Sequence, residues 1–207
     1  MVMSRVKLDT NRVETMKSLS SPQILHAIIE GCFTEKNRTL WRIDSLYDNL
    51  YLLIVSEHSP DLSNLVSQLC VSGEVGQSKN YTIFLESIKN GQGLHFRFRG
   101  NPVRSIATDK DKRGKVVPYF NDRQKKEWLI NKSSKNGFVV DYDSCSIIET
   151  RQLRFYKKGN EKPIRLSCTT FEGMLTVTDM EQFVTALSMG IGRGKSYGCG
   201  LMTVMVI

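Results

Sequence analysis

The amino-acid sequence predicts an α+β protein built from two tandem ferredoxin-like (RRM-like) domains, each with the element order βαββαβ. Some segments alternate apolar and polar residues, as strands do, and others have apolar residues three or four positions apart, as helices do. These segments follow one another in that order. The same order begins again after the glycine-containing stretch 89–93, although the two halves share no evident sequence identity. A length of 207 residues is sufficient for two domains of about 100 residues. We therefore expect domains at residues 1–90 and 93–207.

The first domain is predicted to begin with a strand over residues 2–8, whose apolar residues alternate. A helix is predicted to start at Ser21-Pro22, because an N-cap residue followed by proline is typical of a helix start. Its face is formed by apolar residues at helical spacing, namely Leu25, Ile28, Ile29 and Cys32. The remaining expected elements are strands over 39–44 and 49–56, a helix over 60–70 and a strand over 81–85.

The second domain is predicted to begin with a strand over 94–99, which places His95, Arg97 and Arg99 on one face. A polar, basic loop is expected over 100–118, followed by a helix over 121–135. The later expected elements are strands over 137–142, 147–156 and 163–177, a helix capped by Asp179 and a strand over 200–207. The strands 147–156 and 163–177 are expected to form an inserted hairpin with a basic tip at 157–160.

Positive charge is concentrated in the middle of the chain. The whole sequence has a net charge of +8, yet residues 95–165 alone contain 18 basic and 8 acidic side chains. Charge gathered in this way attracts an anionic partner, most often a nucleic acid, although a solvated face without a partner is the alternative.

Other features exclude several classes of protein. Apolar residues make up 40 % of the chain, which argues against disorder, and no apolar run is long enough for a membrane span. The N-terminus lacks the pattern of a signal peptide. The five cysteines are widely spaced and form no CxxC motif, which favours reduced thiols and a cytoplasmic location and argues against a zinc site. We expect no metal and no cofactor.

A glycine-rich segment, GIGRGKSYGCG, occupies residues 190–200. Its GKS resembles the end of a P-loop, but that motif needs a glycine five positions before Gly194, where this chain has Met189. A P-loop also follows a strand and opens a helix, whereas this segment is predicted to follow a helix and enter a strand. Successive glycines allow backbone N–H groups to converge on an anion, and Arg193 and Lys195 add charge. The alternative is a tight connection that needs backbone freedom.

His26 is predicted to lie off the apolar face of the first helix, near Gln23 and Glu30. A helical histidine is most often a surface residue. Imidazole can also transfer protons at neutral pH, which suits RNA cleavage.

Three segments together resemble the CasE family, the crRNA-processing endoribonucleases of the type I-E Cascade complex. They are PQILHAIIEGCF with its histidine, FRFRGNPVRS with the following VVPYFNDRQKKEWL, and FEGMLTVTDMEQFVTALSMGIGRGKSYGCGLMTV. The resemblance covers nearly the whole chain and implies two tandem ferredoxin-like domains.

The resemblance also implies an activity, namely one metal-independent cut of a CRISPR repeat hairpin in precursor crRNA. The 2′-hydroxyl attacks the phosphate, which leaves a 2′,3′-cyclic phosphate and a 5′-hydroxyl. His26 matches the catalytic histidine and would act as general base or general acid. Members of the family tend to have tyrosine where this chain has Gln23, which puts that tyrosine's contribution in doubt.

From this resemblance we expect the protein to stay bound to the crRNA and to join other Cascade subunits. Alone it is expected to be a monomer, and no association with a membrane is expected. The expected RNA-binding residues are Arg97, Arg99, Arg104, Lys112, Arg113, Lys115, Arg151, Arg154, Lys157, Lys158, Arg193 and Lys195. Two alternatives remain. One is a non-catalytic hairpin-binding subunit of the same fold, and the other is a binder of single-stranded RNA, although the RRM stacking motif is not found.

Overall fold

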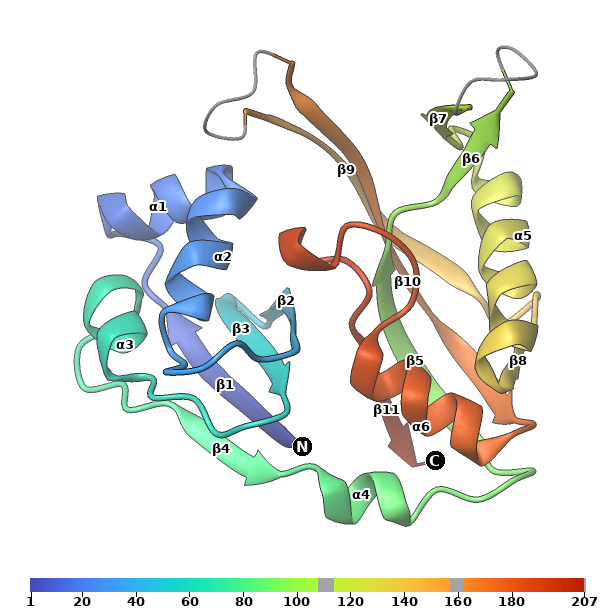
Figure 1. Cartoon of the computed structure of the whole chain (residues 1–207), viewed down its shortest axis with the longest axis horizontal. Helices are drawn as coiled ribbons and strands as arrows, with labels where there is room; N and C mark the ends of the chain where they lie inside the picture. The colour runs from blue at the N-terminus through green and yellow to red at the C-terminus, as the bar shows by residue number, and fades with distance from the viewer. Residues whose placement is uncertain (108–113, 157–161, 207) are drawn as a thin grey trace.

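Two antiparallel sheets form the framework of the protein in a computed structural model, which describes residues 1–107, 114–156 and 162–206 (Figure 1). The first sheet contains β1 (Val2–Leu8), β2 (Thr39–Leu46), β3 (Asn49–Ser56) and β4 (Gln77–Asn80). The second contains β5 (Gly93–Gly100), β8 (Phe138–Val140), β9 (Ser146–Phe155), β10 (Ile164–Val177) and β11 (Met202–Val206). A small separate hairpin is formed by β6 (Val103–Ile106) and β7 (Lys115–Pro118).

The two sheets share one topology. The first has the order β4-β1-β3-β2, and the second has the order β11-β5-β10-β8. In each, the last strand lies beside the first, and the first lies beside the third. This arrangement confirms the predicted tandem ferredoxin-like fold.

Helices connect the strands and cover the sheets. Their bounds are α1 (Val13–Ser20), α2 (Pro22–Glu30), α3 (Ser63–Leu69), α4 (Thr82–Glu86), α5 (Asp122–Ser133) and α6 (Met180–Met189), with 3-10 turns η1 (Ser134–Asn136) and η2 (Lys195–Tyr197). Asp179 caps α6 as predicted, because its carboxylate accepts a hydrogen bond from the Gln182 backbone N–H at 3.0 Å. None of the described helices combines the length and apolar character needed to cross a membrane.

One face of the first sheet packs against α2 and α3. Leu25 and Ile29 of α2 and Leu65 and Leu69 of α3 are almost fully buried in one apolar cluster that also contains Trp41 of β2. The apolar face predicted for the first helix is therefore the face that packs. Because α2 is held along its length, its remaining side chains have defined positions.

The second sheet packs against α5 and α6. Phe98, Trp128 and Phe171 form a stack in which ring centroids are 6.1 to 6.4 Å apart. The ring centroids of Phe183 in α6 and Phe138 in β8 are 5.3 Å apart in the same apolar cluster. Leu40 and Val55 of the first sheet belong to this cluster too, so it extends across the junction of the two halves.

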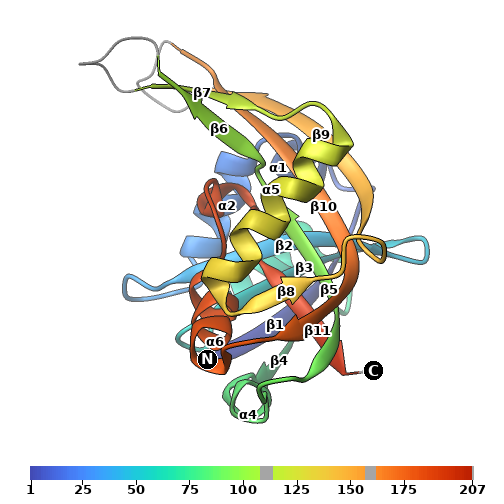
Figure 2. The same ribbon diagram turned by 90° about the vertical axis from the view of Figure 1, so that its right-hand side faces the viewer.

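Two hairpins project from the same end of the molecule. Figures 1 and 2 show β6–β7 and the long β9–β10 hairpin rising together beyond the second sheet. The paired strands β9 and β10 confirm the expected hairpin, and its predicted basic tip lies outside the described residues.

The predicted strand over 81–85 is wrong. The edge strand is β4, and the chain then forms the helix α4. Tyr81, Leu85 and Ile88 are buried at a spacing of four and three residues, which is a helical pattern. All four residues of β4 are exposed, so it pairs with β1 through its backbone and has no apolar alternation to reveal it.

Two further differences concern exposed elements. The expected loop over 100–118 contains the β6–β7 hairpin, whose side chains are mostly exposed and show no alternating burial. Helix α1 was not predicted, because it buries only Thr15 and Ser18. The division into domains at 1–90 and 93–207 stays a prediction. Leu85 and Ile88, at the end of the predicted first domain, belong to the apolar cluster of the second sheet.

Candidate functional site

The glycine-rich segment of the second half returns to α2 of the first half. Its turn η2 lies beside α2, and the Tyr197 ring packs edge-on against the His26 ring. The two ring centroids are 6.5 Å apart and the planes are inclined by 70°. A histidine and a tyrosine that are distant in sequence therefore meet where the two halves join.

The His26 side chain is about one-third exposed, and its Nδ1 atom lies 3.8 Å from the Glu30 carboxylate one turn along α2. Nδ1 is buried and has no hydrogen-bond partner within the described parts of the chain. The amide oxygen of Gln23, one turn earlier, is likewise buried and unpaired there. A side chain with one enclosed and one accessible edge can present a ring nitrogen to a ligand.

Close backbone packing fixes the position of η2. Gly198 has a left-handed φ of 79°, and a Cβ placed there would lie 2.6 Å from the Trp41 ring. Gly194, also left-handed, accepts a hydrogen bond from the Tyr197 N–H at 2.9 Å. Only glycine meets both requirements at position 198 at little cost. At this position the glycine thus serves the tight connection that the sequence left as the alternative, and anion binding by this segment stays a prediction.

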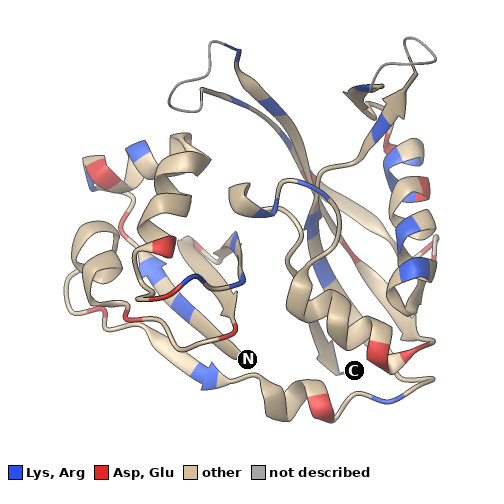
Figure 3. Ribbon diagram, in the orientation of Figure 1, with Lys and Arg blue, Asp and Glu red and all other residues tan. Residues whose placement is uncertain are grey.

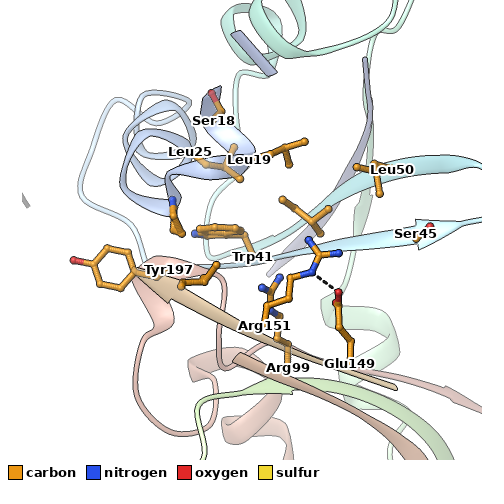
Figure 4. A pocket seen from close by; sticks show the side chains of 13 residues that line it. Ser18, Leu19, Leu25, Trp41, Ser45, Leu50, Arg99, Glu149, Arg151 and Tyr197 are labelled. Atoms are coloured by element: carbon orange, nitrogen blue, oxygen red, sulfur yellow. Dashed lines mark hydrogen bonds and ion pairs between the residues drawn. The ribbon is translucent and has the colours of Figure 1, made fainter. Parts of the chain in front are cut away.

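A cavity of about 130 Å³ lies between the two halves beneath η2 (Figure 4). Trp41 and Leu25 line it from the first half, and Tyr197, Arg99 and Arg151 line it from the second. The indole N–H of Trp41 is buried without a partner among the described residues. The cavity therefore combines apolar walls with donors that can bind an acceptor.

Arg99 and Arg151 point into this cavity from β5 and β9. Arg99 is only 9 % exposed, whereas Arg151 is exposed and pairs with Glu149. A buried guanidinium is costly unless a negative group compensates it. This pair of side chains, both predicted from the sequence, is suited to hold an anion next to the His26 helix.

A second hollow gathers two more predicted residues. Arg104 of β6 and Arg193 of the glycine-rich segment line it together with Lys132 of α5. Arg104 also lies over the Tyr119 ring, 5.6 Å from its centroid. Figure 3 shows Lys and Arg positions on α5, β9 and the glycine-rich segment of the second half, and others on α1, β1 and β4 of the first half.

Arg97 and Lys195 have partners inside the protein. The Arg97 guanidinium pairs with Glu172 and lies 3.7 Å from Asp44, and the Lys195 ammonium donates to the Met189 carbonyl at 2.7 Å. Burial and the nearby Arg38 guanidinium lower the pKa of Lys195. The RNA contacts predicted for both residues stay predictions.

The remaining predicted residues lie on the projecting hairpins. Lys115 is exposed on β7, and Arg154 is exposed on β9, where it lies 3.4 Å from the Tyr156 hydroxyl. Lys112, Arg113, Lys157 and Lys158 lie outside the described residues.

Cys199 of the glycine-rich segment packs against Cys168 of β10. The Cys168 and Cys199 sulfur atoms are 3.2 Å apart and both side chains are buried. The hydrogen bond from the Cys199 thiol, aided by the Arg99 charge, lowers the pKa of Cys168 to about 7 against the opposing effect of burial. The pair couples β10 to the segment that contains Tyr197. Within the described ranges, no three His, Cys, Asp or Glu side chains converge as a metal site would require.

Sequence reasoning missed Tyr197, Trp41 and Glu149 as components of this site. Tyr197 stands among glycines in the sequence, but no spacing relates it to His26. Trp41 follows the pattern of an ordinary buried strand residue. Glu149 could be assigned only once β9 was placed beside the first half.

Comparisons with known proteins agree with this architecture. The chain is 28 % identical over 206 residues to the CRISPR-associated endoribonuclease Cse3 of Thermus thermophilus, covering 94 % of this chain and 90 % of that protein. It is 31 % identical over 121 residues to the Cascade subunit CasE of Escherichia coli, covering 55 % of this chain and 58 % of that protein.

Solved structures show the same fold. Thermus thermophilus Cse3 bound to an RNA representing a pre-cleavage complex superposes with a TM-score of 0.82 at 23 % identity, covering 99 % of this chain and 98 % of that chain. Escherichia coli Cas6e superposes with a TM-score of 0.71 at 22 % identity and full coverage of both chains. The resemblance to CasE predicted from the sequence is confirmed. A family model described as CRISPR associated protein matches residues 1–205, so this chain belongs to that family of CRISPR-associated proteins.

Proposed function

We propose that this protein is a metal-independent endoribonuclease that cuts CRISPR repeat hairpins in precursor crRNA and remains on the product as a Cascade subunit. The observation that carries the proposal is the position of His26 at the junction of the two halves. There it contacts Tyr197, which lines the cavity into which Arg99 and Arg151 point. Similarity to Cse3 and CasE over 206 and 121 residues supports the substrate class.

The proposed reaction is attack of a ribose 2′-hydroxyl on the adjacent phosphate. His26 either accepts the 2′-hydroxyl proton or donates a proton to the leaving 5′-oxygen. The 2′-oxygen–phosphorus bond forms while the phosphorus–5′-oxygen bond breaks. The products are a 2′,3′-cyclic phosphate and a 5′-hydroxyl.

The hairpin stem is recognised by its shape and phosphates, because side chains do not reach into the deep, narrow major groove of A-form RNA. Arg99 and Arg151 are proposed to hold phosphates at the junction, and Arg104 and Arg193 hold the backbone at the second hollow. Lys115 and Arg154 contact the stem from the projecting hairpins. Further proposed contacts come from Arg97, Lys112, Arg113, Lys157, Lys158 and Lys195.

The proposed compartment is the cytoplasm, where precursor crRNA is made. All five cysteines are free thiols in the structure, which is in keeping with a reducing compartment.

The decisive test incubates the purified protein with an end-labelled repeat hairpin in excess EDTA. We expect one cut at the 3′ side of the stem base, with a 2′,3′-cyclic phosphate identified by mass spectrometry. A matched hairpin with a single 2′-deoxy nucleotide before the cut should bind equally and stay intact.

A different result would favour the non-catalytic alternative. Gln23, at the position where the family tends to have tyrosine, is the observation that supports it. Tight binding of the hairpin without any cut would show an assembly subunit and overturn the proposed catalysis. Equal affinity for unpaired RNA would instead indicate a binder of single strands.

A further inference from the structure

We propose that Tyr197 is a second catalytic residue, whose phenolic hydroxyl donates a hydrogen bond to a non-bridging oxygen of the scissile phosphate. This inference rests on the proposed RNA cleavage and deepens it. It assigns to the second half of the chain a direct part in the chemistry, beyond binding the hairpin.

The Tyr197 ring is fixed from two sides. On one side it meets the His26 ring of α2 edge-on at 6.5 Å, and on the other it meets the Phe155 ring of β9 at 4.8 Å and 63°. Edge-on aromatic contacts of this kind are favourable and have a preferred geometry. The ring therefore keeps one orientation relative to the imidazole.

The backbone under Tyr197 is anchored as well. The Tyr197 N–H donates to the Gly194 carbonyl at 2.9 Å, and Gly198 packs directly against the Trp41 ring. The neighbouring Lys195 ammonium is engaged with the Met189 carbonyl at 2.7 Å. The Tyr197 ring is thus held against His26 by a turn whose backbone is itself anchored.

The hydroxyl is presented outward. The Tyr197 side chain is partly exposed, and Figure 4 shows its hydroxyl directed away from the cavity that contains Arg99 and Arg151. A phosphate that accepts from this hydroxyl would therefore lie outside the cavity, on the exposed side of the Tyr197 ring that packs against His26.

The proposed reaction would be accelerated by a hydrogen-bond donor to the non-bridging phosphate oxygens. As the 2′-oxygen bonds to phosphorus, negative charge grows on the non-bridging oxygens before the 5′-oxygen leaves. A donor already fixed at that position stabilises the charge without reorganisation, and removing one such donor typically slows a reaction by about 10² to 10³-fold. The phenol keeps its proton throughout, so His26 remains the group that transfers protons.

The test measures single-turnover cleavage of the repeat hairpin by three variants. Tyr197→Phe keeps the ring contacts with His26 and Phe155 and removes only the hydroxyl. Tyr197→Ala removes both. Tyr47→Phe removes a hydroxyl from a 90 % exposed tyrosine in the β2–β3 turn and serves as the matched control.

We expect Tyr197→Phe to slow cleavage by about 10²-fold while its affinity for the hairpin stays unchanged. Tyr47→Phe should cleave like the unmodified protein. Sulfur in place of one non-bridging oxygen should slow the unmodified protein for one phosphorothioate isomer, and this sulfur effect should shrink in Tyr197→Phe. A purely structural role for Tyr197 would leave the sulfur effect unaltered.

Two outcomes would overturn the inference. One is cleavage by Tyr197→Phe at the unmodified rate, with Tyr197→Ala slow, which would reduce Tyr197 to a packing residue. The other is slow cleavage by Tyr197→Phe with an undiminished sulfur effect. Failure of the proposed function is separate, because the unmodified protein would then not cut the all-ribose hairpin.

Discussion

The Arg42 guanidinium of β2 donates a hydrogen bond to the backbone carbonyl of Arg97 in β5, at 2.8 Å, and so joins the two sheets. It also donates to the Leu201 carbonyl at 3.2 Å and to the Thr203 hydroxyl at 2.7 Å. Asp44 accepts two further bonds at 2.7 Å each. Arg42 is 1 % exposed, and this set of partners compensates its charge. The junction that positions His26 beside Tyr197 is therefore a fixed part of the fold.

Arg42→Ala should destabilise the protein by about 3–5 kcal/mol, because it removes the cation that compensates the Asp44 carboxylate at 2.7 Å and leaves that carboxylate only the longer 3.7 Å contact with Arg97. Urea denaturation measures this as a lower midpoint. Arg123→Ala is the matched control, since Arg123 pairs with Glu127 on the exposed surface of α5 and should leave the midpoint nearly unchanged. Equal midpoints for both variants would contradict the role assigned to Arg42.

Gly198→Ala should be more destabilising than Gly91→Ala. Both glycines have a left-handed φ, 79° and 78°, so each substitution carries the same backbone cost of about 1–2 kcal/mol. Only at Gly198 does the added Cβ meet a ring, that of Trp41, which adds about 1–3 kcal/mol of overpacking. Thermal unfolding of the two variants gives the difference directly. Similar losses would show that the contact with Trp41 relaxes freely.

Replacing His26 should separate catalysis from binding. His26→Ala should slow hairpin cleavage by about 10² to 10⁴-fold, the usual contribution of a general acid or base. Its affinity for the hairpin should be nearly unchanged, because His26 contributes no fixed charge to the basic surface. His58→Ala, which changes an exposed histidine of the same chain, is the control and should cleave normally. Undiminished cleavage by His26→Ala would remove this residue from the mechanism.

Hairpin affinity should fall steeply with salt. If about six phosphates are neutralised, log K should decrease with log salt at a slope of roughly −4 to −5. Arg154→Ala should reduce the magnitude of the slope by about 1, since Arg154 is exposed on β9. Arg5→Ala, on β1 of the first sheet, should leave it unchanged. A slope near zero would contradict a phosphate-binding surface.

The thiol pair makes stability depend on pH. In the folded protein the pKa of Cys168 is about 7, below its usual 9.0. Between pH 7 and pH 9 the Cys168 thiol is therefore protonated in the unfolded chain and deprotonated in the folded protein. Stability should therefore rise with pH from 7 to 9 and lose that gain as pH falls through 7. Above pH 9 the trend reverses, because hydrogen bonding to Cys168 and burial raise the pKa of Cys199.

Denaturation midpoints measured from pH 6 to 10 check this behaviour. Cys168→Ala should abolish the rise between pH 7 and 9. Cys145→Ala should preserve it, because burial raises the pKa of Cys145 rather than lowering it. A flat profile for the unmodified protein would show that the two thiols titrate independently.

Elements with a buried face were predictable from the sequence, and exposed ones were not. The strand over 94–99 and the helix capped by Asp179 were placed correctly, because one side of each is apolar and meets a core. β4 and the β6–β7 hairpin are defined by backbone pairing between exposed residues. The short helix α4 is an exception: Leu85 gives it a buried face, but its five residues are too few for the sequence to distinguish a helix from a strand.

The candidate site divides in a similar way. His26 and the arginines Arg99 and Arg151 could be proposed from residue type, charge and resemblance, since those are properties of the sequence itself. Their arrangement could not, because Arg99 turned out to be buried at the junction and Arg97 to be paired with Glu172. Whether an arginine side chain pairs with a carboxylate or lines a cavity depends on how segments distant in the sequence pack together.

Most of the order of elements, the tandem fold and the concentration of basic residues in one half could be predicted from the amino-acid sequence. These follow from local periodicity and composition. Only the tertiary structure brought Tyr197 to His26 and closed a cavity lined by Trp41 and Arg99. The contact depends on the glycine-rich segment crossing to the other half, where Gly198 meets Trp41 with no room for a Cβ. No pattern within either segment encodes that meeting, because it arises from the way the two sheets pack against each other.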